Sequence, residues 1–420
     1  MSGRSRSMSE ITKTVALAVA FASVLVACTA AQPSVTAMRS RATVSRTPVS
    51  TVIPGYTTTP SPAASSSIRP LARVKAIAVG SGHACAIVSG GTVECWGENQ
   101  FGELGIGTNT GSSDTAVRVM SGLTGATAIA AGGAGTCAIV SGGELECWGR
   151  DDWSQFGPAD SDWTRPVVVP GLSNVTTVTS AGVTTCALVS GGSVECLGAI
   201  WNGTDWSASA APVTVPNLGN ATAIAAAGSS DCALVSGGSV ECWGQGLGVG
   251  SAKGSTVPVT VAGLTAATAI TGSGYGAAHL CALVAGGEVK CWGDNTFGEL
   301  GNGTTTDSST AVTVSGLSGA TAIAAGDHHT CALVTGGAVE CWGWNYAGQL
   351  GDGTTTDRST PVRVSSISGA TAIAAGADQT CALVSGGEVE CWGWGGYAQD
   401  HTKATTPGTL TPVVILAAGS

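Results

Sequence analysis

The chain has 420 residues, of which 43% are hydrophobic, 10% are charged and 63 are glycine, and its formal net charge is −10. Charged residues are well below the usual ~25% and glycine is about twice its usual ~7%, so the composition excludes a disordered chain and a charged coiled coil. Glycine without a three-residue period also excludes collagen. A turn-rich, all-β protein remains, and its length requires an array of repeats or several domains.

The N-terminal residues 1–27 resemble a lipoprotein signal peptide. Arg4, Arg6 and Lys13 precede the uncharged run TVALAVAFASVLVA, which is too short to span a bilayer and has the length of a signal-peptide core. The run leads into Leu-Val-Ala-Cys, which resembles the bacterial lipobox, so we expect Cys28 to be the lipid attachment point. An ordinary signal peptide followed by a chance cysteine is the alternative interpretation.

Residues 28–70 are rich in Ser, Thr and Pro and have no hydrophobic period. Such a stretch buries too little apolar surface to offset its chain entropy, so we expect a flexible tether. The folded part is expected over residues 71–416. Together these segments predict an extracytoplasmic domain that is anchored to the bacterial cell membrane by its N-terminal lipid.

Fourteen of the 15 cysteines form seven Cys-x9-Cys pairs, each in a nearly constant segment such as CALVSGGEVECWG. Their first cysteines are 46 to 52 residues apart, a period typical of propellers and solenoids. Two apolar runs around a Gly-Gly turn predict a β-hairpin with a three-residue loop at 89–91, which places Cys85 opposite Cys95 within disulfide range. We therefore predict seven disulfides within hairpins: Cys85–Cys95, Cys137–Cys147, Cys186–Cys196, Cys232–Cys242, Cys281–Cys291, Cys331–Cys341 and Cys381–Cys391.

Metal binding is the competing interpretation of these cysteines. Each hairpin offers only two thiolates, whereas structural zinc uses four ligands, usually in closely spaced pairs. Reduced, buried cysteines are a further alternative, which an exported protein disfavours. We expect no metal and no cofactor.

Two more strand-like runs recur with each hairpin, one such as ATAIAAG before it and one such as PVRV after it. Seven copies of four strands predict a seven-bladed β-propeller. Because only about six to ten residues separate each PVRV-like run from the next unit, we expect those two strands to pair. The last strand, 412–415, should then pair with 76–79 and close the ring.

The repeated pattern G-x-x-H-T-C-A-L-V-x-G-G-x-V-x-C-W-G-x-N-x-x-G-x-L-G-x-G resembles the repeat of the regulator of chromosome condensation 1 (RCC1) family, most clearly at 294–317 and 344–367. The resemblance covers about 71–416 and implies a seven-bladed β-propeller in a bacterial exported lipoprotein member of the family. It leaves function open, because the family includes a guanine-nucleotide exchange factor, a plant photoreceptor and secreted bacterial inhibitors of β-lactamases. The export signal and the net charge of −10 argue against nucleotide exchange and against nucleic-acid binding.

Two recurring residue types are expected to be structural. The tryptophan of the Trp-Gly pair occupies one position in six of the seven units, with Leu197 in the third, so we expect packing between blades. A histidine lies two residues before the first cysteine in three units, and we expect these side chains to be structural rather than metal ligands. The tryptophans are Trp96, Trp148, Trp243, Trp292, Trp342 and Trp392, and the histidines are His83, His279 and His329.

Aromatic residues in the irregular loops are the candidate ligand contacts. Units two, three and seven depart from the G-x-L-G-x-G pattern, and loops of one class open on one face of a propeller. Aromatic side chains outside the packing register are typical of binding surfaces, although local filling of degraded repeats is the alternative. The candidates are Trp153, Phe156, Trp163, Trp201, Trp206, Trp344, Trp394 and Tyr397, and Tyr346 is a further aromatic residue in the loop of Trp344.

The sequence contains no nucleophile–base constellation, phosphate-binding loop or HExxH motif. We therefore predict a monomeric, non-enzymatic binding propeller that recognises a protein or an envelope glycan through its irregular loops and meets the membrane only through its lipid. Inhibition of a secreted enzyme such as a β-lactamase is the alternative function. Nucleotide exchange on a GTPase is a third, which would require a cytoplasmic location.

Overall fold

The computed structural model describes residues 74–120, 123–158, 162–246, 254–274, 278–394 and 408–416, all of which belong to the compact unit Pro70–Ser420. Every regular element in these ranges is a β-strand. A search of the same residues finds no helix of the length and apolarity that crossing a bilayer demands. The predicted signal peptide, lipid-bearing Cys28, tether and loop residue Tyr397 lie outside the described residues.

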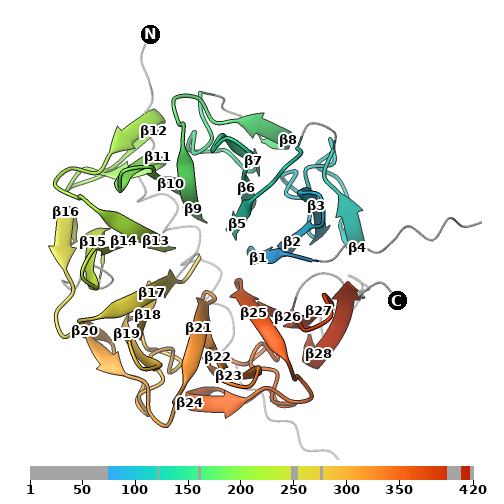
Figure 1. Ribbon diagram of the computed structural model, residues 1–420, viewed down its shortest axis with the longest axis vertical. Coiled ribbons are helices and arrows are strands. Elements are labelled where there is room, and N and C mark those ends of the chain that lie inside the picture. The colour runs from blue at the N-terminus through green and yellow to red at the C-terminus, as the bar shows by residue number, and fades with distance from the viewer. Residues whose placement is uncertain are drawn as a thin grey trace, which may run out of the picture. The chain divides into compact units, whose positions relative to one another are not determined.

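The strands form seven four-stranded antiparallel sheets, which are the blades of a propeller (Figure 1). Within each blade the strands follow chain order from the centre of the ring to its outside. The predicted seven-bladed, all-β fold is therefore confirmed. The strands are, blade by blade, β1 (Ala76–Val79), β2 (His83–Val88), β3 (Thr92–Gly97) and β4 (Ser113–Arg118); β5 (Ala128–Gly132), β6 (Gly135–Ile139), β7 (Leu145–Gly149) and β8 (Trp163–Val168); β9 (Val175–Ala181), β10 (Thr184–Val189), β11 (Ser193–Trp201) and β12 (Trp206–Thr214); β13 (Ala221–Ala227), β14 (Ser230–Val235), β15 (Ser239–Gly244) and β16 (Ser255–Thr260); β17 (Ala267–Gly272), β18 (His279–Val284), β19 (Glu288–Gly293) and β20 (Ser308–Thr313); β21 (Ala320–Ala325), β22 (His329–Val334), β23 (Ala338–Gly343) and β24 (Arg358–Arg363); and β25 (Ala370–Ala375), β26 (Gln379–Val384), β27 (Val389–Gly393) and β28 (Thr409–Leu416).

The hairpin register follows the repeat. In the first blade Val88 lies opposite Thr92 and Cys85 opposite Cys95, as the three-residue turn requires. All seven expected disulfides are present, each between cysteines whose Cα atoms are 4.0 or 4.1 Å apart. Each bridge therefore links two adjacent strands of the same blade and joins no blade to another.

The expected closure of the ring by strand exchange is wrong. β28 pairs with β27 in the seventh blade, and β1 is the inner edge strand of the first blade. The link at 119–127, between the first two blades, reaches about 30 Å when extended. A four-stranded blade is three strand spacings wide, or about 14 Å. The link can therefore run from the outer strand of one blade to the inner strand of the next, and these two strands need not pair.

The ring closes instead by side-chain packing between the first and seventh blades. Val74 and Val79 of the first blade share one buried cluster with Leu383 and Cys391 of the seventh. The inner strands β1 and β25 contact each other as the other neighbouring inner strands do. The seam between the ends of the chain is thus one more interface between blades, without a shared sheet.

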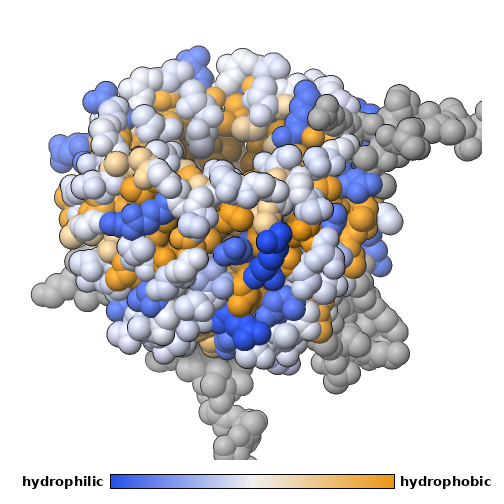
Figure 2. All heavy atoms as spheres, turned by 60° about the horizontal axis from the view of Figure 1, so that its bottom comes forward, coloured by the Kyte–Doolittle hydropathy of each residue, from blue (hydrophilic) through white to orange (hydrophobic). Residues whose placement is uncertain are grey.

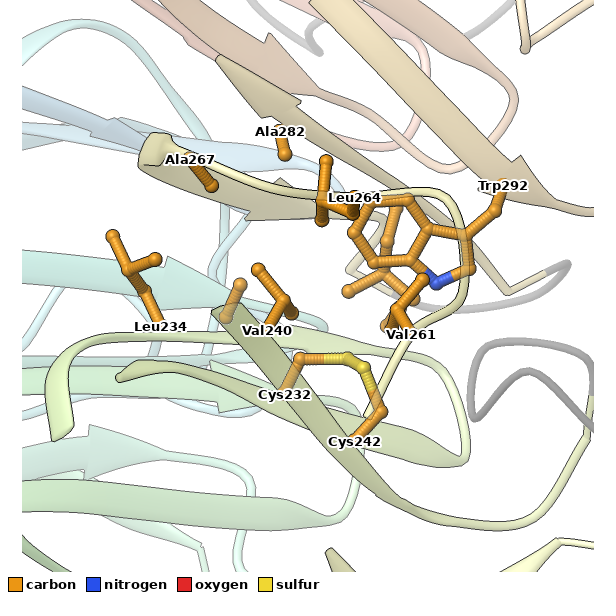
Figure 3. Packing of buried hydrophobic residues seen from close by; sticks show 12 residues of the cluster. Cys232, Leu234, Val240, Cys242, Val261, Leu264, Ala267, Ala282 and Trp292 are labelled. Carbon is orange, nitrogen blue, oxygen red and sulfur yellow. A yellow bond between two sulfur atoms is a disulfide. The ribbon is translucent and has the colours of Figure 1, made fainter. Parts of the chain in front are cut away.

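The hydrophobic core lies between the blades, in layers that the Trp-Gly tryptophans fill. Trp292 of the fifth blade lies against Val261, Leu264 and the Cys232–Cys242 disulfide of the fourth (Figure 3). All six such tryptophans are buried, which confirms their packing role. Burying an aromatic side chain of this size contributes on the order of 4–6 kcal/mol before entropy is counted.

The outer strands leave valine side chains exposed at the rim, including Val168 and Val414, which are 50% and 52% exposed. Five of the seven outer strands also contain a proline, which has no N–H to offer a further strand and so blocks edge-to-edge pairing. Strongly hydrophilic and hydrophobic residues are scattered over a surface that is mostly of intermediate hydropathy (Figure 2). Only 10% of the residues of the chain are charged.

Candidate binding face

The connections between strands divide over the two ends of each blade. Because successive strands are antiparallel, the turn from the first to the second strand and the loop from the third to the fourth open at the same end. The Gly-Gly turns and the links between blades lie at the other end. We call the first of these ends the loop face; it carries the irregular loops that the sequence singled out.

In the regular repeats, the loop of one blade is fastened to the next blade. In the fifth blade the Asn295 side chain accepts the Leu300 N–H at 2.9 Å and shapes the loop. The Glu299 carbonyl oxygen then accepts hydrogen bonds from Trp342 Nε1 at 2.7 Å and from Thr330 Oγ1 at 3.1 Å, both in the sixth blade. The first and sixth blades repeat this arrangement with Glu103 and Gln349. The G-x-L-G-x-G segment is therefore a clasp between blades.

The three repeated histidines belong to the same interfaces. His83, His279 and His329 are fully buried, and each Nε2 lies 2.8–3.0 Å from the hydroxyl of a threonine in the next blade. Burial lowers the pKa of His83 to about 4 and the pKa of His279 and His329 to about 3, so these rings are neutral at physiological pH. Within the described ranges no three His, Cys, Asp or Glu side chains are grouped to hold a metal ion.

Phe156 was wrongly predicted as a ligand contact. It is 1% exposed and occupies the clasp position of Leu300, packed against Leu197 of the third blade. A larger residue in the clasp thus faces a smaller one in the tryptophan position. The neighbouring Asp151 carboxylate accepts the Phe156 N–H and the Trp163 indole N–H, each at 2.9 Å, so it links the loop to Trp163, the first residue of β8.

Trp344 lies in an aromatic cluster at the boundary of the fifth and sixth blades. Its ring centroid is 5.5 Å from Phe297, 5.6 Å from His328 and 5.9 Å from Tyr346, on which it stacks. Tyr346 is 73% exposed. The Glu299 carboxylate, 3.6 Å from His328 Nδ1, raises the pKa of this histidine. We call the four aromatic side chains Phe297, His328, Trp344 and Tyr346 the Tyr346 cluster.

Sequence reasoning missed two members of the Tyr346 cluster, Phe297 and His328. Phe297 lies in a loop that keeps the regular repeat pattern, so it gave no sign of departure. His328 is the first of two consecutive histidines, and the repeat position belongs to the second, His329. The extra histidine next to the regular one was the available signal.

The other candidate tryptophans occupy different parts of the loop face. Trp201 and Trp206 are register partners near the tip of the β11–β12 hairpin, with centroids 5.5 Å apart. Trp394 is 38% exposed at the end of the seventh blade, and Trp153 is half-buried in the second. The structure therefore brings together Trp201 with Trp206, and Trp344 with Tyr346 and with the unpredicted Phe297 and His328.

A cavity of about 250 Å³ lies at the centre of the ring. The inner strands line it with backbone and with small apolar side chains, chiefly alanine and glycine. Asp327 is the carboxylate among its described lining residues. The centre of the ring therefore presents few side chains that could recognise a ligand, in contrast to the loop face.

Comparison with known families and proteins identifies the repeat. The model of the regulator of chromosome condensation (RCC1) repeat matches residues 286–333 and 337–383, and a second model of the same repeat matches 74–103 and 320–349. The ultraviolet-B receptor UVR8 of Arabidopsis thaliana is 35% identical over 86 residues, which are 20% of this chain and 19% of that protein. The human E3 ubiquitin-protein ligase HERC2 is 37% identical over 101 residues, 23% of this chain and 2% of that protein. The chain thus spans a small part of the relatives that it matches.

Solved structures support the fold at low sequence identity. Human WBSCR16 superposes with a TM-score of 0.67 at 20% identity, covering 75% of this chain and 88% of that one. Yeast RCC1 (Prp20), solved bound to Kap60, gives a TM-score of 0.66 at 21% identity and covers 77% and 83% of the two chains. Prp20p from Saccharomyces cerevisiae, studied for its binding to Gsp1p and histones, gives 0.66 at 20% identity over 83% and 86%.

Proposed function

We propose that this chain, which belongs to the RCC1-repeat proteins, is an extracytoplasmic binding propeller that recognises a protein or cell-envelope ligand through its loop face. The Tyr346 cluster is the observation that carries the proposal. An exposed tyrosine stacked on a tryptophan offers a large, rigid contact area at low entropic cost, and such residues dominate binding hot spots.

The compartment is part of the proposal. Seven disulfides within blades support an oxidising environment, because cytosolic thiols are kept reduced. The lipid anchor at Cys28 and the tether that follows it are proposed on the sequence alone. In this arrangement the tether holds the propeller away from the membrane while the loop face remains free to bind.

One structural relative, yeast Prp20, supports a role in protein recognition. One structure of Prp20 holds it in complex with Kap60, and another was studied for its binding to Gsp1p and histones. The present chain differs from a nucleic-acid-binding protein in its charge, since a net charge of −10 repels phosphates. We therefore place its ligand among envelope proteins and glycans, and a secreted enzyme inhibited by the chain is one form that a protein ligand could take.

The proposal is tested by site-specific photocrosslinking of the full chain in cells. A photoreactive phenylalanine replaces Tyr346 in one variant and Val414, which is 52% exposed on the outer strand β28, in the control. We expect discrete crosslinked products from position 346 that Trp344→Ala removes, since this change takes away the ring on which the probe stacks. Identical products from both positions, or products that survive Trp344→Ala, would refute recognition by the Tyr346 cluster.

A further inference from the structure

A second pocket lies between the third and fourth blades. It has a volume of about 60 Å³ and is lined by β11, β12, β14, β15 and β16. In the first, second, fifth and sixth blades, the corresponding loop places a leucine or phenylalanine against the next blade. In the third blade the β11–β12 hairpin continues instead to Trp201 and Trp206, and the space that the clasp would fill is open.

The missing clasp changes the surroundings of the fourth blade's tryptophan. Trp243 is 9% exposed, whereas the other five Trp-Gly tryptophans are each 0% exposed. It lines the pocket together with Trp201 and Trp206. Three indole rings from two blades therefore border one small space.

A carboxylate enters the same space. Asp231, the register partner of Trp243, stands immediately before the first hairpin cysteine, where the second, sixth and seventh blades have a threonine that bonds to the preceding blade. In the parts of the chain that the structure describes, the Asp231 side chain makes no hydrogen bond or ion pair. Desolvation raises its pKa to about 7, as expected for a carboxylate without a counter-charge.

We infer that this pocket, the Asp231 pocket, binds an alkylammonium head group. The faces of indole rings are the best aromatic partners for cations, and cages of this kind recognise quaternary and methylated ammonium groups. A bound cation would also supply the positive charge that is missing beside Asp231. An opposite charge nearby stabilises the ionised form of a desolvated carboxylate. The positions of three indoles and one carboxylate are thus accounted for by one ligand chemistry.

The size of the pocket agrees with this chemistry. One water molecule requires about 10–15 Å³ by the same measure, so about 60 Å³ holds a group of roughly four to six heavy atoms. A methylated ammonium has this size and needs few hydrogen-bond acceptors. A guanidinium group carries five donors, and the pocket offers fewer polar side chains to receive them. The Asp231 pocket is separate from the Tyr346 cluster, so the inference does not depend on the proposed function.

Titration of the full chain with tetramethylammonium chloride tests the inference, with sodium chloride at equal ionic strength as the reference and tryptophan fluorescence as the signal. We expect saturable binding, weakened about tenfold or more (about 1.4 kcal/mol) by Asp231→Asn, because this change removes the negative charge that attracts the cation. Trp206→Leu should weaken binding similarly. Asp114→Asn, at an exposed site on β4 with the same change of net charge, should leave it unchanged.

Two further ligands separate the sources of the head group. Choline represents a free quaternary amine, and a short peptide with a trimethylated lysine, compared with its norleucine counterpart, represents a protein side chain. Preference for either over its control supports the inference and names the source. No saturable binding of any ammonium probe, equal affinity of the wild type and Asp231→Asn, or binding of an uncharged oligosaccharide that Asp231→Asn does not affect would overturn it.

Discussion

The clasp between the fifth and sixth blades allows a quantitative test of how the blades are joined. Trp342 is fully buried against Leu300, and its indole N–H is donated to the Glu299 carbonyl at 2.7 Å. Replacing a buried tryptophan by alanine costs about 3–5 kcal/mol, and leucine keeps part of the side chain, so we expect Trp342→Leu to cost about 2–3 kcal/mol. About 1 kcal/mol of this is the lost hydrogen bond, since Glu299 retains its bond from Thr330.

The second and third blades indicate how the cavity left by Trp342→Leu can be filled. There, Phe156 in the clasp faces Leu197 in the tryptophan position. Leu300→Phe alone should overpack the fifth-to-sixth interface and cost about 1–3 kcal/mol. In the double variant the phenylalanine fills the vacated space, so the two changes should together cost less than the sum of their separate costs by about 2 kcal/mol.

Urea denaturation of the four proteins, followed by circular dichroism under non-reducing conditions, measures this coupling energy. Tyr346→Leu serves as a surface control, expected to change stability by no more than about 0.5 kcal/mol because Tyr346 is 73% exposed. Additive costs of Trp342→Leu and Leu300→Phe would show that the two side chains do not compete for one space. The account of the clasp as the element that joins the blades would then be refuted.

The remaining predictions concern acid stability, the hairpin turns and the disulfides. The folded state lowers the pKa of its three buried histidines, so these groups should cost stability as pH falls from about 6.5 towards 4. The raised pKa values of Asp231, Glu103, Asp151 and His328 act in the opposite direction. His329→Gln, which copies the residue at this position in the seventh blade, should flatten the pH dependence of the urea midpoint; an unchanged slope contradicts this assignment. Gly337→Ala should lower the melting temperature more than Gly336→Ala. Both glycines have positive φ, but only a Cβ at 337 would meet backbone, 2.7 Å from the Gly369 Cα. Equal effects of the two changes would exclude this clash as the cause. Mass analysis after alkylation without reduction should find no modified hairpin cysteine, whereas alkylation of several pairs would contradict the disulfide assignment.

The parts of the fold that depend on local sequence could be predicted. Hairpin register follows from the turn length and the alternation of side chains, which is why Cys85 could be placed opposite Cys95 from sequence alone. Ring closure depends on whether the last strand pairs with the third strand of its own blade or with the first strand of the chain, and the length of the links does not decide between them. The pairing of residues 412–415 with 76–79 was therefore predicted wrongly, although the number of blades was correct.

The binding face could be predicted only in part, for a related reason. The aromatic residues of irregular loops were identified as departures from the repeat, but the repeat does not say whether a departure points outward or replaces a core residue. Phe156 does the latter, as its contact with Leu197 shows. Asp231 was overlooked because it lies inside a regular hairpin segment, and its significance depends on the loop of the preceding blade, which the structure alone places beside it.

The confinement of each disulfide to a single blade has a consequence for how the protein is made. In the oxidising compartment proposed for this chain, each second cysteine would follow its partner by only 10 residues as the chain emerges, before the cysteines of the next blade. Vectorial synthesis thus favours the native bond at every step and lowers the need for isomerase-driven reshuffling among fourteen thiols. The gain or loss of a whole unit during evolution would likewise carry its own bond with it and leave the remaining connectivity intact.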